Sequence, residues 1–140
     1  MVTRKTTAIA FIGILITAGL VVFVTQVQAQ TPDEQQQALI GEWRGAWAWG
    51  WGHTCTLIIH EIDAAKAKAR CTYTSSTLGE KKYPVLADFT PGPDPKLEFQ
   101  LEGNELKFVL KKNILQGARK GMSGGFYSTA TTEMEKYPKK

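Results

Sequence analysis

All four tryptophans of the chain lie within residues 41–51, and each is an even number of residues from the next. In a β-strand alternate side chains share one face, whereas helical spacing would scatter these positions around the axis. The segment therefore predicts a first strand whose indole side chains point into a small β-structure. The positions in this stripe are Trp43, Trp47, Trp49 and Trp51.

The chain begins with a pattern typical of an export signal. Arg4 and Lys5 precede an apolar run without charges over residues 6–24, and Val27-Gln28-Ala29 follows as a signal-peptidase site. We expect residues 1–29 to be a cleaved signal peptide and the protein to be periplasmic or secreted in a bacterium. The apolar run is also close to the length that spans a bilayer, so the alternative is an inner-membrane anchor over residues 6–24.

The rest of the chain is long enough for one domain and too short for two. We expect a short helical cap within residues 30–40, a β-domain over residues 41–135 and a polar tail over residues 136–140. The chain has 17 basic and 13 acidic residues, and its lysines are dispersed. This balance predicts no nucleic-acid partner, and an uncleaved signal segment is the only membrane contact that we expect.

The helical cap begins with a recognisable start signal. Thr31 can serve as the N-cap, Pro32 stands at the first helical position, and Glu34 completes a capping box. The pattern predicts a helix that continues to about Ile40 and closes one end of the domain.

The only two cysteines lie on two expected strands, at about residues 53–62 and 65–74, joined by a tight turn near Asp63. A register that places Ile59 opposite Ala67 also places Cys55 opposite Cys71 on the inner face, close enough for a bridge. Two cysteines in an oxidising compartment favour a disulfide. We therefore expect a Cys55–Cys71 disulfide within this hairpin.

Five further strands follow with short connections. Alternating apolar residues predict a strand over residues 83–89 and a hairpin with Gly103-Asn104 as its two-residue turn, in which Phe99 faces Phe108 and Leu101 faces Leu106. Weaker patterns predict strands over residues 114–122 and 126–134. Eight consecutive strands with one apolar face predict an all-β fold, an eight-stranded antiparallel up-and-down β-barrel that leaves no exposed edge.

The segment Gly41-Glu42-Trp43, after a short helix and before an eight-strand meander, resembles the G-x-W pattern of the calycin superfamily. This superfamily contains the lipocalins and their avidin-like and fatty-acid-binding relatives, and small calycin-type barrels occur among bacterial exported proteins. The resemblance implies that Trp43, with Gly41, closes one end of the barrel. Lipocalins also place an arginine of the final strand over this tryptophan. Residues 126–134 contain no arginine, and Arg119 belongs to the strand before them.

The aromatic stripe suggests two alternative functions. We expect Trp47 to fill the core, and Trp49 and Trp51 to line the open end with Tyr73 and His53 as polar partners. Aromatic walls with a few polar groups suit a small apolar or aromatic-compatible ligand. The alternative is a structural or interaction module of the cell envelope whose barrel is filled by its own side chains.

The sequence predicts no enzyme activity, cofactor or metal site. His53 and His60 are the only histidines, and Glu61, which could complete a ligand set, alternates away from His60. Ser123 formally matches the G-x-S-x-G motif of hydrolases, but that motif requires a turn from a strand into a helix. A glycine-rich hairpin turn accounts for it, and weak hydrolysis at Ser123 is a remote alternative.

Overall fold

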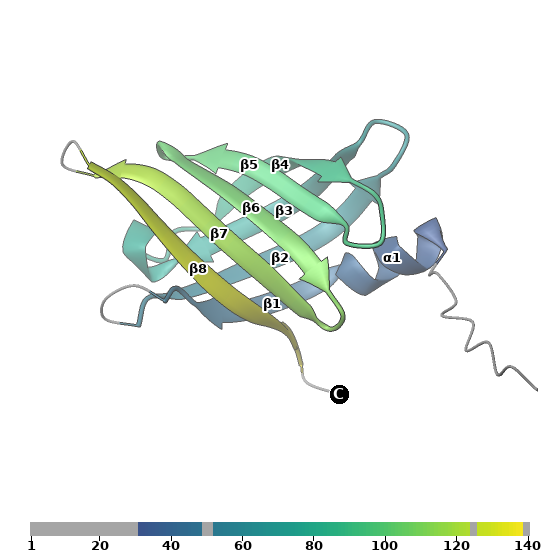
Figure 1. Cartoon of the computed structure of the whole chain (residues 1–140), viewed down its shortest axis with the longest axis horizontal. Helices are drawn as coiled ribbons and strands as arrows, with labels where there is room; N and C mark the ends of the chain where they lie inside the picture. Colours follow the sequence, from purple (N-terminus) through teal and green to yellow (C-terminus); the bar gives the residue numbers. More distant parts are fainter. Residues whose placement is uncertain (1–30, 49–51, 124–125, 139–140) are drawn as a thin grey trace, which may run out of the picture.

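The computed structural model describes residues 31–48, 52–123 and 126–138, which form one closed antiparallel barrel of eight strands preceded by a helix (Figure 1). Consecutive strands are neighbours, and β1 and β8 complete the barrel, as the alternating pattern predicts. The elements are α1 (Pro32–Leu39), β1 (Gly41–Ala46), β2 (Thr54–Asp63), β3 (Lys68–Ser75), the 3-10 turn η1 (Ser76–Leu78), β4 (Tyr83–Thr90), β5 (Lys96–Leu101), β6 (Asn104–Lys111), β7 (Ile114–Ser123) and β8 (Phe126–Tyr137).

The start of α1 is as predicted. The Thr31 hydroxyl accepts a hydrogen bond from the Glu34 backbone N–H at 3.3 Å, and the Glu34 carboxylate accepts one from the Thr31 N–H at 2.9 Å. These reciprocal bonds satisfy donors that the first turn of a helix leaves free.

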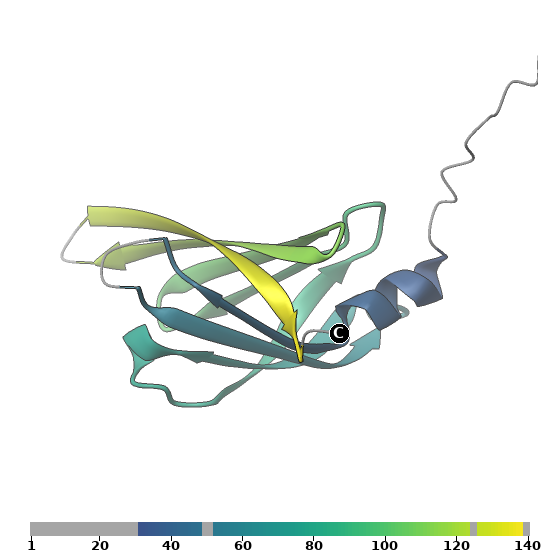
Figure 2. The same cartoon turned by 90° about the horizontal axis from the view of Figure 1, so that it is seen from below.

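The other end of α1 is fastened to the barrel. Figure 2 shows the helix at one end of the barrel, beside the end of β8. Each of its last four carbonyls accepts a hydrogen bond, which satisfies acceptors that a helix end leaves free. The bonds run from Ile40 N–H to Gln36, from Lys136 Nζ to Gln37 and Ala38, and from Trp43 Nε1 to Leu39.

Trp43 is buried beneath this helix, with 2% of its surface exposed. Lys136 of β8 lies over it, with Nζ 5.5 Å from the centre of the ring. The final strand thus places a lysine over this tryptophan. β8 runs through Tyr137, so Lys136 and Tyr137 belong to the barrel and not to the polar tail that the sequence predicts.

The first strand is shorter than predicted, because it ends at Ala46. Trp47 is already outside the strand but remains 2% exposed, and its N–H donates to the His53 carbonyl at 2.8 Å. The prediction that Trp47 belongs to the core is therefore confirmed. Trp49 and Trp51 lie outside the described residues.

The predicted register of the β2–β3 hairpin is wrong, and so is the disulfide that depended on it. Cys55 pairs with Ser75 and Cys71 pairs with Ile59, so the two cysteines are not opposite each other, and both are free and buried. The turn is longer than expected because Ala67 adopts a left-handed φ of 51° and lies before β3. A shift by an even number of residues keeps both thiols on the inner face, which is why alternation alone did not reveal the error.

A similar shift occurs in the β5–β6 hairpin. Phe99 pairs with Leu106 and Leu101 with Asn104, whereas the sequence predicted that Phe99 would face Phe108. The turn residues are Glu102 and Gly103, whose φ values of 50° and 74° suit a type I′ turn. Asn104 begins β6, where its side-chain amide donates to the carbonyls of the turn.

Candidate functional site: the opening between β4 and β5

The wall of the barrel opens between β4 and β5. These strands pair at three positions, from Thr90↔Lys96 to Asp88↔Glu98, and then separate. Beyond Asp88, residues 83–87 of β4 pair with β3 alone, and residues 99–101 of β5 pair with β6 alone. The two strands therefore leave an opening bordered by one unpaired edge on each side.

β1 and β8 also share only three directly paired positions, but their contact continues along both strands. The Thr132 hydroxyl donates to the Ala46 carbonyl at 2.7 Å, and the Ala48 N–H donates to the Thr131 carbonyl at 2.8 Å. Gly45 permits this close approach, since a Cβ there would lie 2.8 Å from the Thr132 hydroxyl. The β1–β8 seam is thus held closed, in contrast to the β4–β5 seam.

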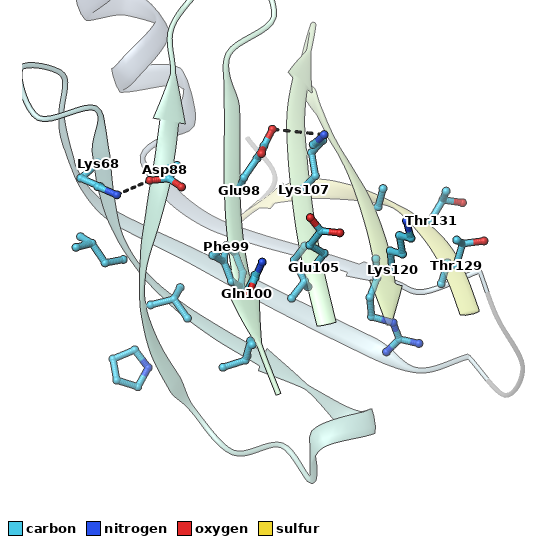
Figure 3. Close-up of a pocket in the computed structure, with 18 residues that line it drawn as sticks. Lys68, Asp88, Glu98, Phe99, Gln100, Glu105, Lys107, Lys120, Thr129 and Thr131 are labelled. Atoms are coloured by element: carbon cyan, nitrogen blue, oxygen red, sulfur yellow. Dashed lines mark hydrogen bonds and ion pairs between the residues drawn. The ribbon is translucent and has the colours of Figure 1, made fainter. Parts of the chain in front are cut away.

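A cavity of about 640 Å³ lies at the β4–β5 opening (Figure 3). Residues of both faces of the sheet line it, and most of them face outward, so the cavity extends from the opening over the outer face of the barrel as far as β8. The inner-face residues are Val85, Phe99, Leu101, Leu106, Arg119 and Ala130. The outer-face residues include Pro84, Leu86, Gln100, Glu105, Lys120, Thr129 and Thr131.

The inner side of the cavity ends on a cluster of aromatic rings. Phe99 stacks on Phe108 with ring centres 5.8 Å apart, and it meets Tyr73 edge-on at 5.7 Å. Trp47 lies 6.4 Å from Phe108 and donates its indole N–H to the Tyr73 hydroxyl at 3.0 Å. These side chains fill the barrel at this level, so the accessible space lies beside the cluster, at the opening.

Arg119 supplies the positive charge of the inner face. It projects inward from β7, with its guanidinium carbon 5.3 Å from the centre of the Trp47 ring and Nη1 3.4 Å from the Thr77 hydroxyl. The side chain is half-buried and lines the cavity. The inner face of the opening thus combines apolar and aromatic side chains with one cation, whereas charged side chains of both signs line its outer face.

Burial shifts the titration of three neighbouring inner-face groups. Desolvation raises the pKa of Cys55 to about 11 and that of Cys71 to about 12, with smaller lowering effects from Arg119 on Cys55 and from Arg70 on Cys71. Desolvation also raises the pKa of Tyr73. At neutral pH all three are therefore protonated, and neither thiol is a nucleophile.

The residues that the sequence assigned to the site are only partly brought together. Tyr73 is in the barrel but 1% exposed; it packs against the aromatic cluster and is not among the residues that line the cavity. His53 lies apart from the cavity, with Nδ1 3.4 Å from the Ser76 hydroxyl at η1. Trp49 and Trp51, which the sequence predicts to line the open end, lie outside the described residues.

Sequence reasoning missed the side opening and its residues Val85, Leu101 and Arg119. The alternation of β4 and β5 placed Val85 and Leu101 on the inner face, but it carried no sign that the strands separate. An arginine at an inward position between Gly117 and Gly121 was the one available signal, because a cation on an apolar face calls for an explanation.

The described part of the chain includes both histidines and Ser123. No group of three or more His, Cys, Asp or Glu side chains there could hold a metal ion, and His60 is exposed with Nε2 2.8 Å from the Thr72 hydroxyl. Ser123 is the last residue of β7, paired with Phe126 of β8, so the motif joins two strands and not a strand and a helix.

A second cavity, of about 670 Å³, lies at the helix end of the barrel. Trp43, Leu110, Ile114 and Lys136 contribute to it, and Tyr137, held by Arg44 at 3.4 Å from its ring centre, forms one wall. Lys136 donates to the carbonyls of Gln37 and Ala38, so its ammonium group serves the contact with α1.

No protein-family model matches the chain, and no curated protein or solved structure matches it significantly. None of the helices within the described residues is long and apolar enough to cross a membrane.

Proposed function

We propose that this protein is an exported, non-enzymatic barrel of calycin type that binds a small apolar or aromatic ligand at the opening between β4 and β5. The observation that carries the proposal is the separation of these strands, which gives access to the inner-face side chains Val85, Phe99 and Leu101 in a cavity of about 640 Å³. This volume lies within the range of about 300–1,000 Å³ that is common for ligand sites, and the apolar walls are those of the inner face.

Two features of the fold support the calycin assignment within this proposal. The barrel is closed and follows the up-and-down order, and Trp43 is buried under α1 with a cation from the last strand above it. Export rests on the sequence of residues 1–29, which precedes the described part. The non-enzymatic role is proposed because the two thiols of the described chain are buried and protonated at neutral pH, and Ser123 lies in a connection between two strands.

One observation favours a second function. Trp47, Tyr73, Phe99 and Phe108 occupy the barrel at the level of the opening, which a side-chain-filled interaction module of the cell envelope would also show. In that case the opening would hold no small molecule, and the outer face of the barrel would carry the function.

A matched pair of substitutions separates the two functions. Val85→Trp places a bulky side chain at the opening, whereas Val109→Trp places one on the outer face of β6, away from the cavity lining. The probe is the neutral dye N-phenyl-1-naphthylamine, titrated by its fluorescence. If Val85→Trp excludes about 60 Å² of apolar contact, affinity should fall about tenfold, while Val109→Trp should bind like the wild type. Equal affinity of both variants, or no binding by the wild type, would favour the interaction module.

A further inference from the structure

Arg119 differs from the other cations around the opening because its charge points inward. Its neighbours on β7, Ala118 and Lys120, are exposed on the outer face, while Arg119 lies against the Trp47 ring. The guanidinium offers five N–H donors, and its hydrogen bond to Thr77 uses one of them. The same side chain is one of the residues that line the cavity.

Two of the three outer lysines of the same cavity form ion pairs with carboxylates. Lys68 pairs with Asp88, and Lys107 pairs with Glu98 at 3.5 Å, as the dashed lines in Figure 3 show. Lys120 stands directly opposite Glu105 on the neighbouring strand. Within residues 31–48, 52–123 and 126–138, no carboxylate forms an ion pair with Arg119.

The surroundings of Arg119 strengthen its attraction for an anion. Trp47, Phe99 and Leu106 are buried beside it, and apolar walls lower the local dielectric constant, so a charge-assisted hydrogen bond there is stronger than one in water. A planar guanidinium also matches two oxygens of a carboxylate, sulfonate or phosphate. An anion at the paired outer lysines would instead have to displace a carboxylate.

We propose that the ligand of this opening is an apolar or aromatic molecule with one anionic group, and that Arg119 binds this group on the inner face. This inference rests on the proposed function, and it adds the chemical class of the ligand and its orientation. The anionic end enters first and meets Arg119, while the apolar part contacts Val85, Phe99 and Leu101 at the opening.

The test compares two dyes with the same aromatic skeleton, the anionic 1-anilinonaphthalene-8-sulfonate and the neutral N-phenyl-1-naphthylamine, on the wild type and three variants. Arg119→Gln removes the inner charge, Arg119→Lys keeps it, and Lys120→Gln removes a charge one residue away on the outer face. We expect the wild type to prefer the anionic dye by about 10- to 100-fold. Arg119→Gln should lose this preference, whereas Arg119→Lys and Lys120→Gln should keep most of it.

The outcomes distinguish the two levels of the proposal. Equal binding of both dyes by the wild type would overturn the role of Arg119 and leave the proposed function standing, and so would an anion preference that survives in Arg119→Gln. Loss of the preference in Lys120→Gln alone would assign the anion to the outer face and overturn the inference. If neither dye binds the wild type, the proposed function itself fails. Should Arg119→Gln not fold, Arg119→Lys together with Lys120→Gln still decides between the inner and the outer charge.

Discussion

The two buried thiols should make the stability of the protein depend steeply on pH in the alkaline range. Burial raises the pKa of Cys55 from 9.0 to about 11 and that of Cys71 from 9.0 to about 12. Between pH 9 and these raised pKa values the folded protein retains thiol protons that the unfolded chain releases, so alkaline pH favours unfolding. The thiol contribution is fully present below pH 9 and is lost as the pH rises through the folded-state values.

The size of the effect follows from the shifts. At pH 10 each unfolded thiol is mostly ionised while each folded thiol is still mostly protonated, which corresponds to about 1.4 kcal/mol per group. Cys55 and Cys71 together should lower the free energy of unfolding by about 3 kcal/mol between pH 8 and pH 10. This is a large part of the 5–15 kcal/mol that is typical for the net stability of a domain.

The assay is urea unfolding at pH 8, 9 and 10 of the wild type and of the double variant Cys55→Ala/Cys71→Ala. The variant should be less stable at pH 8, because two small cavities form, but its stability should change less with pH. The difference between the two pH profiles removes the contributions of tyrosines and lysines, which are common to both proteins. Parallel profiles would refute the reasoning, and they are also the result expected if a Cys55–Cys71 disulfide existed.

Two further predictions concern single hydrogen-bonding side chains. Tyr73→Phe removes the acceptor of the buried Trp47 indole N–H, so it should lower the free energy of unfolding by about 1–3 kcal/mol in urea titrations. The control Tyr83→Phe, at a half-exposed position, should change this free energy by less than about 0.5 kcal/mol. Lys136→Met removes the donor to two carbonyls of α1, so hydrogen exchange of the α1 amides should accelerate while that of the β2 amides stays unchanged. Equal acceleration in α1 and β2 would contradict a local role of Lys136.

The strands and their inner faces could be predicted because alternation is a local property of the sequence. Leu97, Phe99, Leu106 and Phe108 are buried as their spacing indicates, and the capping box at Thr31 is formed. Each of these features depends on residues a few positions apart, and a period of two admits a single division into inner and outer faces.

Register could not be predicted with the same method. Both hairpins are displaced along the strands, since turns with positive φ at Ala67 and Glu102 are uncommon for residues that carry a Cβ. The predicted faces of β2 hold only as far as Ile59, because a bulge follows it; His60 and Glu61 are both exposed, so the predicted alternation between them is wrong. The displacement of the β2–β3 register determines the chemical state of the two cysteines. It separates Cys55 from Cys71, and it turns an expected disulfide into two buried thiols with raised pKa values.

The sequence by itself thus determined the class of the fold, the order of the strands and which side chains face the core, because these depend on short-range periodicity. Only the tertiary structure decided where neighbouring strands separate and which inward charge lies at the opening. The separation of β4 from β5 depends on how each strand pairs with its other neighbour, and Arg119 meets Trp47 and Thr77 across the barrel. Such relations between residues far apart in the chain leave no periodic signal in the sequence.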